Sequence, residues 1–373
     1  MATAGATAGA AELLDGKALS KSVLAELQAR IEREHLRPHL HVINVGDDPA
    51  SQVYVKQKRL AAEKIGVRFS QTALPVDATL SELLKVVSAR NSDGDTHGII
   101  VQLPLPEALR EHERKVLEHI DPAKDVDCFH PVNFGQLALG SPVFLPATPA
   151  GVLRMIKHYG IETRGKRCVI LGKSNIVGKP LALLLAQEDG PAATVFLCDQ
   201  YTEGIWELTR QADILIVAAG KHHLISDPSV LRADGQVTII DVGIHRVQNS
   251  AGKWVVQGDV NTSAVQNHCR WITPVPGGAG PMTVACLLEQ VVEAASRLGT
   301  RDPSCTYIEQ IVQAAFPKDN GQLTSGELLR LLAKLDPTCA TEQLRRAISS
   351  MAGDEEHINL QEFVRWAFGQ NGS

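Results

Sequence analysis

Residues 167–180 read RCVILGKSNIVGKP, and this stretch decides the fold of the second half of the chain. It predicts a buried strand at 167–171, a turn with a glycine at each end, and a helix over 178–187. A further strand at 194–198 makes this a βαβ unit of the Rossmann type, in which glycines let the backbone approach a pyrophosphate. Apolar strands at 214–217 and 237–241 continue the sheet.

The turn at 172–178 lacks the common Gly-x-Gly-x-x-Gly spacing, so its context carries the argument. Asp199 follows the next strand, where a carboxylate can accept hydrogen bonds from a ribose 2′-hydroxyl and repel a 2′-phosphate. Without the glycine turn upstream, a turn or capping role would explain Asp199 equally well. Together the two features predict a dinucleotide site.

The first half of the chain also alternates helices and strands. Apolar residues at helical spacing predict a helix over 14–31, and a second helix begins after Asp48 and ends before Gly66. This alternation predicts a parallel α/β layer. The other expected elements are strands at 41–46 and 98–103 and helices at 111–120 and 281–295.

Composition restricts the class of protein. With 373 residues, 44% of them hydrophobic, the chain is long enough for two or three domains. A net charge of −5 argues against nucleic-acid binding, and no apolar run approaches the roughly 18 residues of a membrane span. Seven scattered cysteines without a Cys-x-x-Cys pair fit free thiols and predict no metal site. Because residues 1–10 resemble no signal or transit peptide, we expect a flexible tail on a cytoplasmic protein.

Three polar motifs in the first half are candidates for catalysis. Tyr54 and Lys58 are four residues apart, so a phenol and an amine can share one helix face, although a solvated basic face is the simpler explanation. Gln102 ends a strand that prolines stop, and its amide can lie in a cleft beside a lysine. Asp125 and Asp127 share one face of an extended chain, and either could bind a polar ring edge or merely cap a loop.

Residues 274–283 read PVPGGAGPMT, with three glycines among three prolines. Such a segment can form neither a helix nor a central strand, and its bare backbone can lie against a flat ligand. We therefore expect a binding loop.

These motifs together resemble the bifunctional methylenetetrahydrofolate dehydrogenase/cyclohydrolase family over residues 12–298. The resemblance implies NAD(P)⁺-dependent oxidation of 5,10-methylenetetrahydrofolate and hydrolysis of the product to 10-formyltetrahydrofolate. It also implies a homodimer. The matching motifs are Tyr54–Lys58, Val101–Pro104, Asp125–Asp127, Thr148–Pro149, Gly172–Pro180, Asp241–Ile244, Gly258–Val260 and Ile272–Thr283.

The resemblance assigns roles to residues at matching positions. Lys58 is the implied catalytic lysine, Tyr54 stacks on the folate, Gln102 interacts with Lys58, and Asp127 holds the pterin. The further folate-binding residues are Val101, Leu103, Pro276, Gly277, Gly278, Ala279 and Gly280. The implied dinucleotide-binding residues are Gly172, Lys173, Ser174, Val177, Asp199, Gln200, Ile244 and Thr283.

The chain departs from the family pattern at several positions. Lys173 replaces the usual Arg, and Asp199-Gln200 replaces the usual His-Ser. NADP⁺ is the family default, but the carboxylate and amide here favour NAD⁺. Cys128 replaces a glycine, Ala147 a cysteine and His245 an asparagine, and these changes affect loop shape more than chemistry.

Residues 304–373 are predicted to form a separate all-α domain that resembles a pair of EF-hands. Gly321, Leu323 and Glu327 have the spacing of a calcium loop, and Ile358 with Glu362 repeats its last part. Oxygen ligands are missing at the first and third loop positions, so we expect a calcium-free appendage that either docks a protein partner or has a structural role. A calcium-sensing domain is the alternative.

The expected architecture is therefore an N-terminal α/β catalytic domain, a Rossmann NAD(P)-binding domain and a small EF-hand-like domain. Alternative functions are a monofunctional dehydrogenase and a scaffold or calcium-responsive protein with a vestigial enzyme part. The expected boundaries are a tail at 1–10, a folate-binding domain at 11–149 with a returning helix at 281–297, a Rossmann domain at 150–280 and the last domain at 304–373.

Overall fold

A computed structural model describes residues 11–249, 252–299, 322–324, 326 and 357–359. The chain divides into two compact units, residues 1–295 and 296–373. The predicted tail and most of the predicted EF-hand-like domain lie outside the described residues. In the second unit, β12 (Gln322–Thr324) pairs antiparallel with β13 (His357–Asn359), with Leu323 opposite Ile358.

The first sheet of unit 1 has three parallel strands, in the order β3 (Arg68–Leu74), β2 (His39–Val45) and β4 (Gly98–Val101). The cap predicted for the second helix is confirmed, because the Asp48 carboxylate accepts a hydrogen bond from the Ser51 N–H at 2.7 Å. Gly66 follows that helix with a φ of +83°. The helices of this part are α1 (Gly16–Arg33), α2 (Pro49–Lys64), α3 (Leu80–Asn91), α4 (Glu107–Arg110), α5 (Glu113–Leu117) and α6 (Pro131–Ala138).

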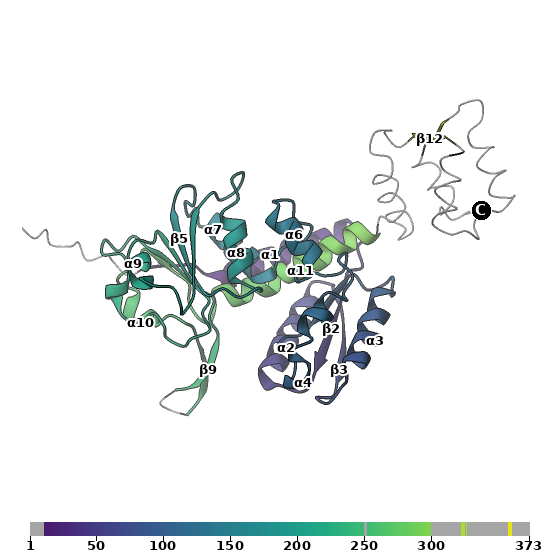
Figure 1. Cartoon of the computed structure of the whole chain (residues 1–373), viewed down its shortest axis with the longest axis horizontal. Coiled ribbons are helices and arrows are strands. Elements are labelled where there is room, and N and C mark those ends of the chain that lie inside the picture. The colour runs from purple at the N-terminus through teal and green to yellow at the C-terminus, as the bar shows by residue number, and fades with distance from the viewer. Residues whose placement is uncertain (1–10, 250–251, 300–321, 325, 327–356, 360–373) are drawn as a thin grey trace, which may run out of the picture. The chain divides into compact units, whose positions relative to one another are not determined.

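The second sheet is the predicted Rossmann sheet, and all its strands are parallel (Figure 1). Its edge strand β1 (Glu12–Leu13) comes from the start of the chain, so these residues belong to this sheet and not to the first domain as we expected. The other strands, in sheet order, are β11 (Trp271–Ile272), β8 (Thr238–Asp241), β7 (Ile214–Val217), β5 (Arg167–Leu171) and β6 (Thr194–Cys198). Its shorter helices are α8 (Gly178–Leu185), α9 (Ile205–Thr209), η1 (Pro228–Val230) and α10 (Thr262–Val265).

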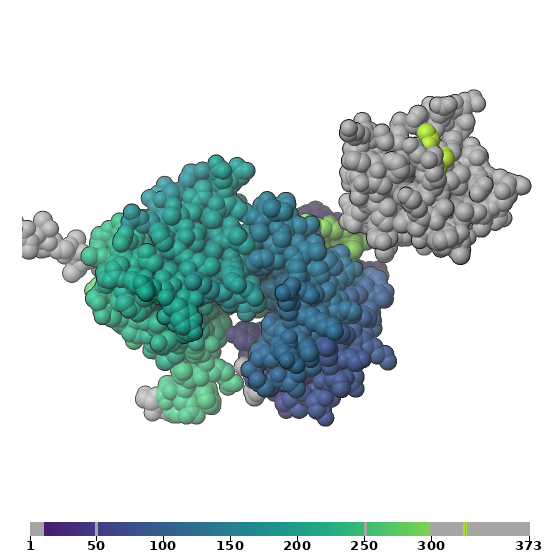
Figure 2. Space-filling model, in the orientation of Figure 1, coloured from purple at the N-terminus to yellow at the C-terminus, as the bar shows by residue number. Residues whose placement is uncertain are grey.

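A hairpin that the sequence did not predict lies between β8 and α10 in the chain. Among the described residues, strands β9 (His245–Gln248) and β10 (Trp254–Gln257) pair with each other and with no other strand. Figure 2 shows the hairpin as a green arm that projects from the rest of the Rossmann part. It carries exposed Trp254, over whose ring the Arg246 guanidinium lies at 5.4 Å.

Helix α1, α7 (Ala147–His158) and α11 (Ala279–Gly299) lie between the two sheets (Figure 1). One apolar cluster runs through these helices and reaches strands of both sheets. Arg30 on α1 pairs with Glu293 on α11 at 3.1 Å, and Arg154 on α7 pairs with Glu289 on α11. The two sheets therefore share one core.

Other expected elements differ from the structure at their ends. The helix predicted at 111–120 is only the short helix α5, and a second short helix, α4, precedes the predicted range. The closing helix begins at Ala279, two residues earlier than predicted. In the described part of the chain, no helix is long and apolar enough to cross a membrane.

Strand β2 is buried along its whole length although it contains His39 and His41. Both imidazoles hydrogen-bond the Ser70 hydroxyl at 2.6 Å, and His41 also bonds Thr72 at 2.9 Å. Burial, with the nearby charges of Arg90 and His39, lowers the pKa of His41 to about 4. The fold therefore holds these histidines neutral.

This neutral pair makes stability depend on pH. The unfolded chain binds a proton on His41 below about pH 6.5, whereas the folded chain binds it only near pH 4, so acid favours unfolding. We expect the free energy of unfolding to fall by on the order of 3 kcal/mol between pH 7 and pH 4 through this residue. Urea unfolding of His41→Gln should give a flatter pH curve, while His268→Gln, an exposed control, should follow the wild type. Parallel curves for His41→Gln and the wild type would contradict this account.

Candidate active site

Tyr54 and Lys58 lie one turn apart on α2, and both are half-buried, whereas Lys56, Arg59 and Lys64 are exposed. A solvated basic face therefore describes the other cations of this helix but not Lys58. Burial lowers the pKa of the Lys58 ammonium, and the neighbouring Asp127 carboxylate raises it. Burial also raises the pKa of the Tyr54 phenol, which stays neutral.

Gln102 fixes the position of the lysine. Its backbone N–H donates to the Ile43 carbonyl at 2.8 Å, which continues the β2–β4 ladder by one residue. The Lys58 Nζ donates to Gln102 Oε1 at 3.1 Å, and Gln102 Nε2 donates to the Leu103 carbonyl at 2.8 Å. The second bond sets the amide with its oxygen toward the amine. The predicted contact between these two residues is present.

The two carboxylates of the Asp125-Val126-Asp127 motif have different surroundings. Asp125 is buried and accepts hydrogen bonds from the Phe129 and His130 N–H groups and from Asn133 Nδ2 at 2.9–3.2 Å. Among the described residues, none hydrogen-bonds the Asp127 carboxylate. Burial raises the pKa of Asp127 to about 6, Lys58 opposes this shift and Asp125 adds to it. Asp125 holds the loop, which leaves Asp127 free for a ligand.

The residue that follows Asp127 has a left-handed backbone. Cys128 has a φ of +59°, and its N–H donates to the Asp125 carbonyl at 3.1 Å. A glycine adopts this conformation without steric cost, whereas a cysteine pays one. The replacement of the family's glycine by Cys128 therefore strains the backbone of this loop. The Cys128 side chain is fully buried, and burial raises the pKa of its thiol, so the sulfur is packed as an apolar group.

The Pro–Gly segment forms a shaped loop, as the sequence predicts. Gly277 has a φ of +122°, and the Val275–Pro276 peptide bond is cis. A Cβ on Gly278 would lie 2.7 Å from the Cβ of Thr273, and one on Gly16 would lie 2.0 Å from the Gly278 carbonyl oxygen. The start of α1 therefore packs directly against this loop. The last two loop residues, Ala279 and Gly280, already belong to α11.

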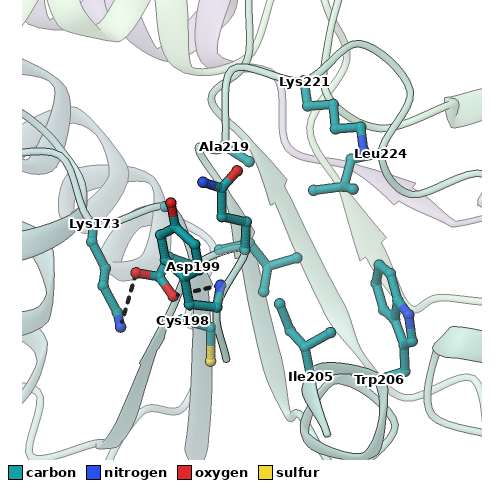
Figure 3. A pocket seen from close by; sticks show the side chains of 12 residues that line it. Lys173, Cys198, Asp199, Ile205, Trp206, Ala219, Lys221 and Leu224 are labelled. Atoms are coloured by element: carbon teal, nitrogen blue, oxygen red, sulfur yellow. Dashed lines mark hydrogen bonds and ion pairs between the residues drawn. The ribbon is translucent and has the colours of Figure 1, made fainter. Parts of the chain in front are cut away.

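A cavity of about 530 Å³ lies at the carboxyl ends of β5, β6 and β7 (Figure 3). Lys173 Nζ and Asp199 Oδ2 pair across one side of it at 3.3 Å, while Ile205, Trp206 and Leu224 line another part. The Tyr201 N–H also donates to Asp199, at 3.1 Å. Partial burial opposes ionisation, but these hydrogen bonds and the Lys173 charge lower the pKa of Asp199.

The glycine turn permits this geometry. Gly172 has a φ of +122°, and a Cβ there would lie 2.1 Å from the Ala218 carbonyl oxygen. A Cβ on Gly178 would lie 1.8 Å from the Gly172 carbonyl oxygen. Ser174 closes the turn, because its hydroxyl accepts from the Val177 N–H at 3.1 Å. Only glycine fits at both ends of this turn.

The structure brings some of the expected site residues together and gives others a different place. Gly172, Lys173, Asp199 and Gln200 line the cavity. Ile244 approaches Gly280, since a Cβ on Gly280 would lie 3.8 Å from its Cδ1, and the hydroxyl of Thr283 bonds that of Thr148 at 3.0 Å. Val101 is a core residue with 2% exposure, whereas Leu103 is partly buried against the same core.

Several lining residues were missed in the sequence. Tyr201, Trp206, Lys221 and Leu224 all follow the carboxyl ends of β6 and β7. The rule that ligands of such sheets bind at these ends points to the segments after Asp199 and after Val217. In the described part of the chain, no group of three metal-ligating side chains converges.

Comparison with known proteins agrees with this geometry. Residues 14–127 match the family model of the tetrahydrofolate dehydrogenase/cyclohydrolase catalytic domain, and residues 146–298 match its NAD(P)-binding domain. The chain is 46% identical over 288 residues to the bifunctional protein FolD of Acetivibrio thermocellus, which covers 76% of this chain and 97% of that one.

Two solved structures give the same result. The chain is similar to the bifunctional FolD enzyme of Campylobacter jejuni, with 44% identity, a TM-score of 0.70, and coverage of 77% of this chain and 99% of that one. The Trypanosoma brucei enzyme, complexed with an NADP cofactor and an inhibitor, has 35% identity, a TM-score of 0.72, and coverage of 79% and 100%. The chain therefore belongs to the tetrahydrofolate dehydrogenase/cyclohydrolase family and is a bifunctional enzyme of one-carbon folate metabolism.

Proposed function

We propose that Lys58 is the acid–base residue of the cyclohydrolase reaction and that folate binds between Tyr54 and the 276–280 loop. The enzyme oxidises 5,10-methylenetetrahydrofolate with NAD(P)⁺ and hydrolyses the methenyl product to 10-formyltetrahydrofolate. The single observation that carries the assignment is the Lys58 Nζ, held 3.1 Å from Gln102 Oε1 in a half-buried position.

Hydrolysis requires proton transfer, which an amine of lowered pKa can perform near neutral pH. A water oxygen bonds to the methenyl carbon, and a water proton passes to the neutral Lys58 amine. The bond from that carbon to N5 then breaks, its electron pair stays on N5, and the protonated amine gives its proton to N5. The hydroxyl on the carbon releases its own proton to solvent as it becomes the formyl C=O, so hydrolysis of the methenyl cation releases one proton overall. Gln102 supports this exchange because its oxygen accepts a hydrogen bond from the amine in either protonation state.

Oxidation depends mainly on positioning. The nicotinamide, when bound, accepts the hydride that leaves the methylene carbon. Tyr54 offers a neutral ring for stacking on the pterin, and the 276–280 backbone offers a flat wall. The Asp127 carboxylate has no protein donor among the described residues, which supports its assignment to the polar edge of the pterin.

The Lys58 proposal predicts unequal losses of the two activities. We expect Lys58→Met to lower the cyclohydrolase kcat by at least about a hundredfold, because the acid–base group is lost. The dehydrogenase kcat should fall much less, since the hydride does not pass through the amine. Hydrolysis of methenyltetrahydrofolate followed by absorbance measures the first, and the appearance of the reduced nucleotide measures the second.

Lys56→Met is the matched control, because Lys56 lies on the same helix but is exposed. It should leave both activities at the wild-type level. An undiminished hydrolysis rate in folded Lys58→Met would exclude the acid–base role.

We also propose that the enzyme uses NAD⁺ at least as well as NADP⁺. Asp199 is 31% exposed, lines the nucleotide cavity and is ionised, so its charge opposes a ribose 2′-phosphate. Lys173 could attract that phosphate, but its ammonium is already paired with Asp199. Asp199 therefore disfavours NADP⁺ in two ways. Its negative charge repels the 2′-phosphate, and its ion pair with Lys173 occupies the ammonium that could bind that phosphate.

Asp199→Ser should reverse this effect, because it removes the repulsive charge and frees the Lys173 ammonium. We expect the ratio of kcat/KM for NADP⁺ to that for NAD⁺ to rise by about tenfold. Asp189→Ser, at an exposed position after α8, should leave the ratio unchanged. A wild-type enzyme with a strong NADP⁺ preference, or an unchanged ratio in Asp199→Ser, would refute the assignment.

The assembly and location of the enzyme are further proposals. We infer a homodimer through the Rossmann part, supported by the position of β6 at an edge of the six-stranded sheet. Leu139, which follows α6 and is 85% exposed, adds support, because α6 packs against α8 and α8 packs against β6. A cytoplasmic location is supported by five unpaired, buried cysteines: Cys128, Cys168, Cys198, Cys269 and Cys286.

The C-terminal segment 304–373 is proposed to be an EF-hand-like pair that binds a protein partner and not calcium. The antiparallel pairing of Leu323 with Ile358 supports it, since these residues have equivalent places in the two loops. Counting back from Glu327 and Glu362, the first and third loop positions are Phe316, Lys318, Met351 and Gly353, which offer no side-chain oxygen.

Light scattering and calorimetry on the full chain test the assembly and the segment together. We expect a particle of twice the 40.2 kDa chain mass and no heat of calcium binding in the micromolar range. A monomer would contradict the dimer proposal, and saturable calcium binding would contradict the calcium-free assignment.

A further inference from the structure

Asp259 is a carboxylate that the proposed chemistry does not use, and it has no solvent exposure. Its Oδ2 accepts hydrogen bonds from the backbone N–H groups of Ala219 and Gly220, at 2.7 and 2.9 Å. These two residues follow β7, and Ala219 lines the nucleotide cavity together with Lys221 and Leu224. The buried carboxylate therefore holds one wall of that cavity through its backbone.

The far end of this wall is fastened differently. The Ile225 N–H donates to the Asp259 carbonyl at 3.1 Å, and the Asn261 N–H donates to the Ile225 carbonyl at 2.8 Å. Backbone pairing thus fixes residue 225, whereas the Asp259 side chain fixes residues 219 and 220. The conformation of the wall next to the cavity depends on how that carboxylate is oriented.

The orientation of Asp259 has one further determinant, the imidazole of His245 at the start of β9. His245 Nε2 lies 2.7 Å from Asp259 Oδ1, and the imidazole is 20% exposed. Because a carboxylate only accepts, the Nε2 atom carries the proton of this bond. A Cβ on Gly243 would lie 2.2 Å from the same Oδ1, so the chain before His245 is shaped to admit the carboxylate.

We propose that His245 is a positioning residue for the dinucleotide, acting through Asp259 on the wall formed by residues 219–224. His245 satisfies the one carboxylate oxygen that the wall does not use. Without it, that oxygen is buried and unpaired, and the carboxylate is free to turn away from the Ala219 and Gly220 N–H groups. The inference rests on the proposed placement of the nucleotide in this cavity.

Other titratable groups surround His245. The His222 ring centroid lies 5.5 Å from that of His245 and 3.8 Å from that of His223, and His222 Nε2 lies 2.7 Å from Gln257 Oε1. Arg246, the next residue, lies over the Trp254 ring. Burial, with the neighbouring imidazoles His222 and His245, lowers the pKa of His223. Among the groups around His245, Asp259 is the one that hydrogen-bonds its imidazole.

The experiment compares His245→Ala with His245→Gln, in which an amide nitrogen can reach the position of Nε2. We expect His245→Ala to raise KM for the dinucleotide and the Kd of the reduced nucleotide, measured by fluorescence, by about tenfold. That fold-change matches the loss of one charge-assisted hydrogen bond. The kcat should change less than about twofold, and His245→Gln should recover most of the affinity.

The enzyme supplies its own control, because cyclohydrolase turnover consumes no dinucleotide. It should be unchanged in His245→Ala, which shows that the variant is folded. His268→Ala, an exposed histidine of the same part of the chain, should leave KM unchanged. Asp259→Asn, which keeps the size of the side chain but removes its charge, should reproduce the rise in KM.

Two results would overturn the proposal. One is an unchanged dinucleotide KM in His245→Ala. The other is an equal loss of dinucleotide affinity in His245→Ala and His245→Gln, which would show that the packing of the imidazole, and not its hydrogen bond, is responsible. A different result identifies failure of the proposed nucleotide site. If Asp199→Ser alters neither dinucleotide constant while His245→Ala raises KM, the role proposed for Asp199 is wrong and the positioning role of His245 stands.

Discussion

The site depends on keeping an ammonium group in a place where water cannot fully solvate it. Among the described residues, Lys58 has one hydrogen bond, to Gln102, and a carboxylate neighbour, Asp127, with which it forms no hydrogen bond. A direct salt bridge would hold the proton on the amine and remove its use as a base. A neutral amide as the immediate partner fixes the amine without deciding its charge. Burial then lowers the pKa of Lys58, and Asp127 limits how far it falls.

This arrangement requires the two sheets to fold as one body. Helix α11 begins within the 276–280 loop, and its apolar side chains join a core that reaches both sheets. A Cβ on Gly98, at the start of β4, would lie 3.1 Å from Cγ2 of Val291 on α11, so the strand and the helix are in close contact. Strand β1 links the two parts covalently, because it pairs with β11 in the Rossmann sheet and is followed directly by α1. A loss of packing along α11 would therefore disturb the 276–280 loop and strand β4 together.

The sequence predicted the parts of this fold that local chemistry determines. The glycine turn at 172–178, the Asp48 cap and the Pro–Gly loop follow from backbone rules that hold wherever the segment lies. It could not predict that Glu12 and Leu13 pair with Trp271 and Ile272, because strand pairing over 259 residues leaves no local pattern. The β9–β10 hairpin was missed for a related reason. Strand β9 reads HRVQ and lacks an apolar signal, and the apolar run at 254–256 in β10 does not by itself predict a hairpin.

The sequence also did not distinguish carboxylates that hold a loop from those that few or no loop N–H groups occupy. Asp125, Asp241 and Asp259 each accept hydrogen bonds from two or three backbone N–H groups, and each therefore holds a loop. Asp127 and Asp199 occupy similar loops in sequence, yet one has no donor among the described residues and the other lines a cavity. The difference lies in the backbone conformation around each side chain, which determines how many loop N–H groups occupy the carboxylate.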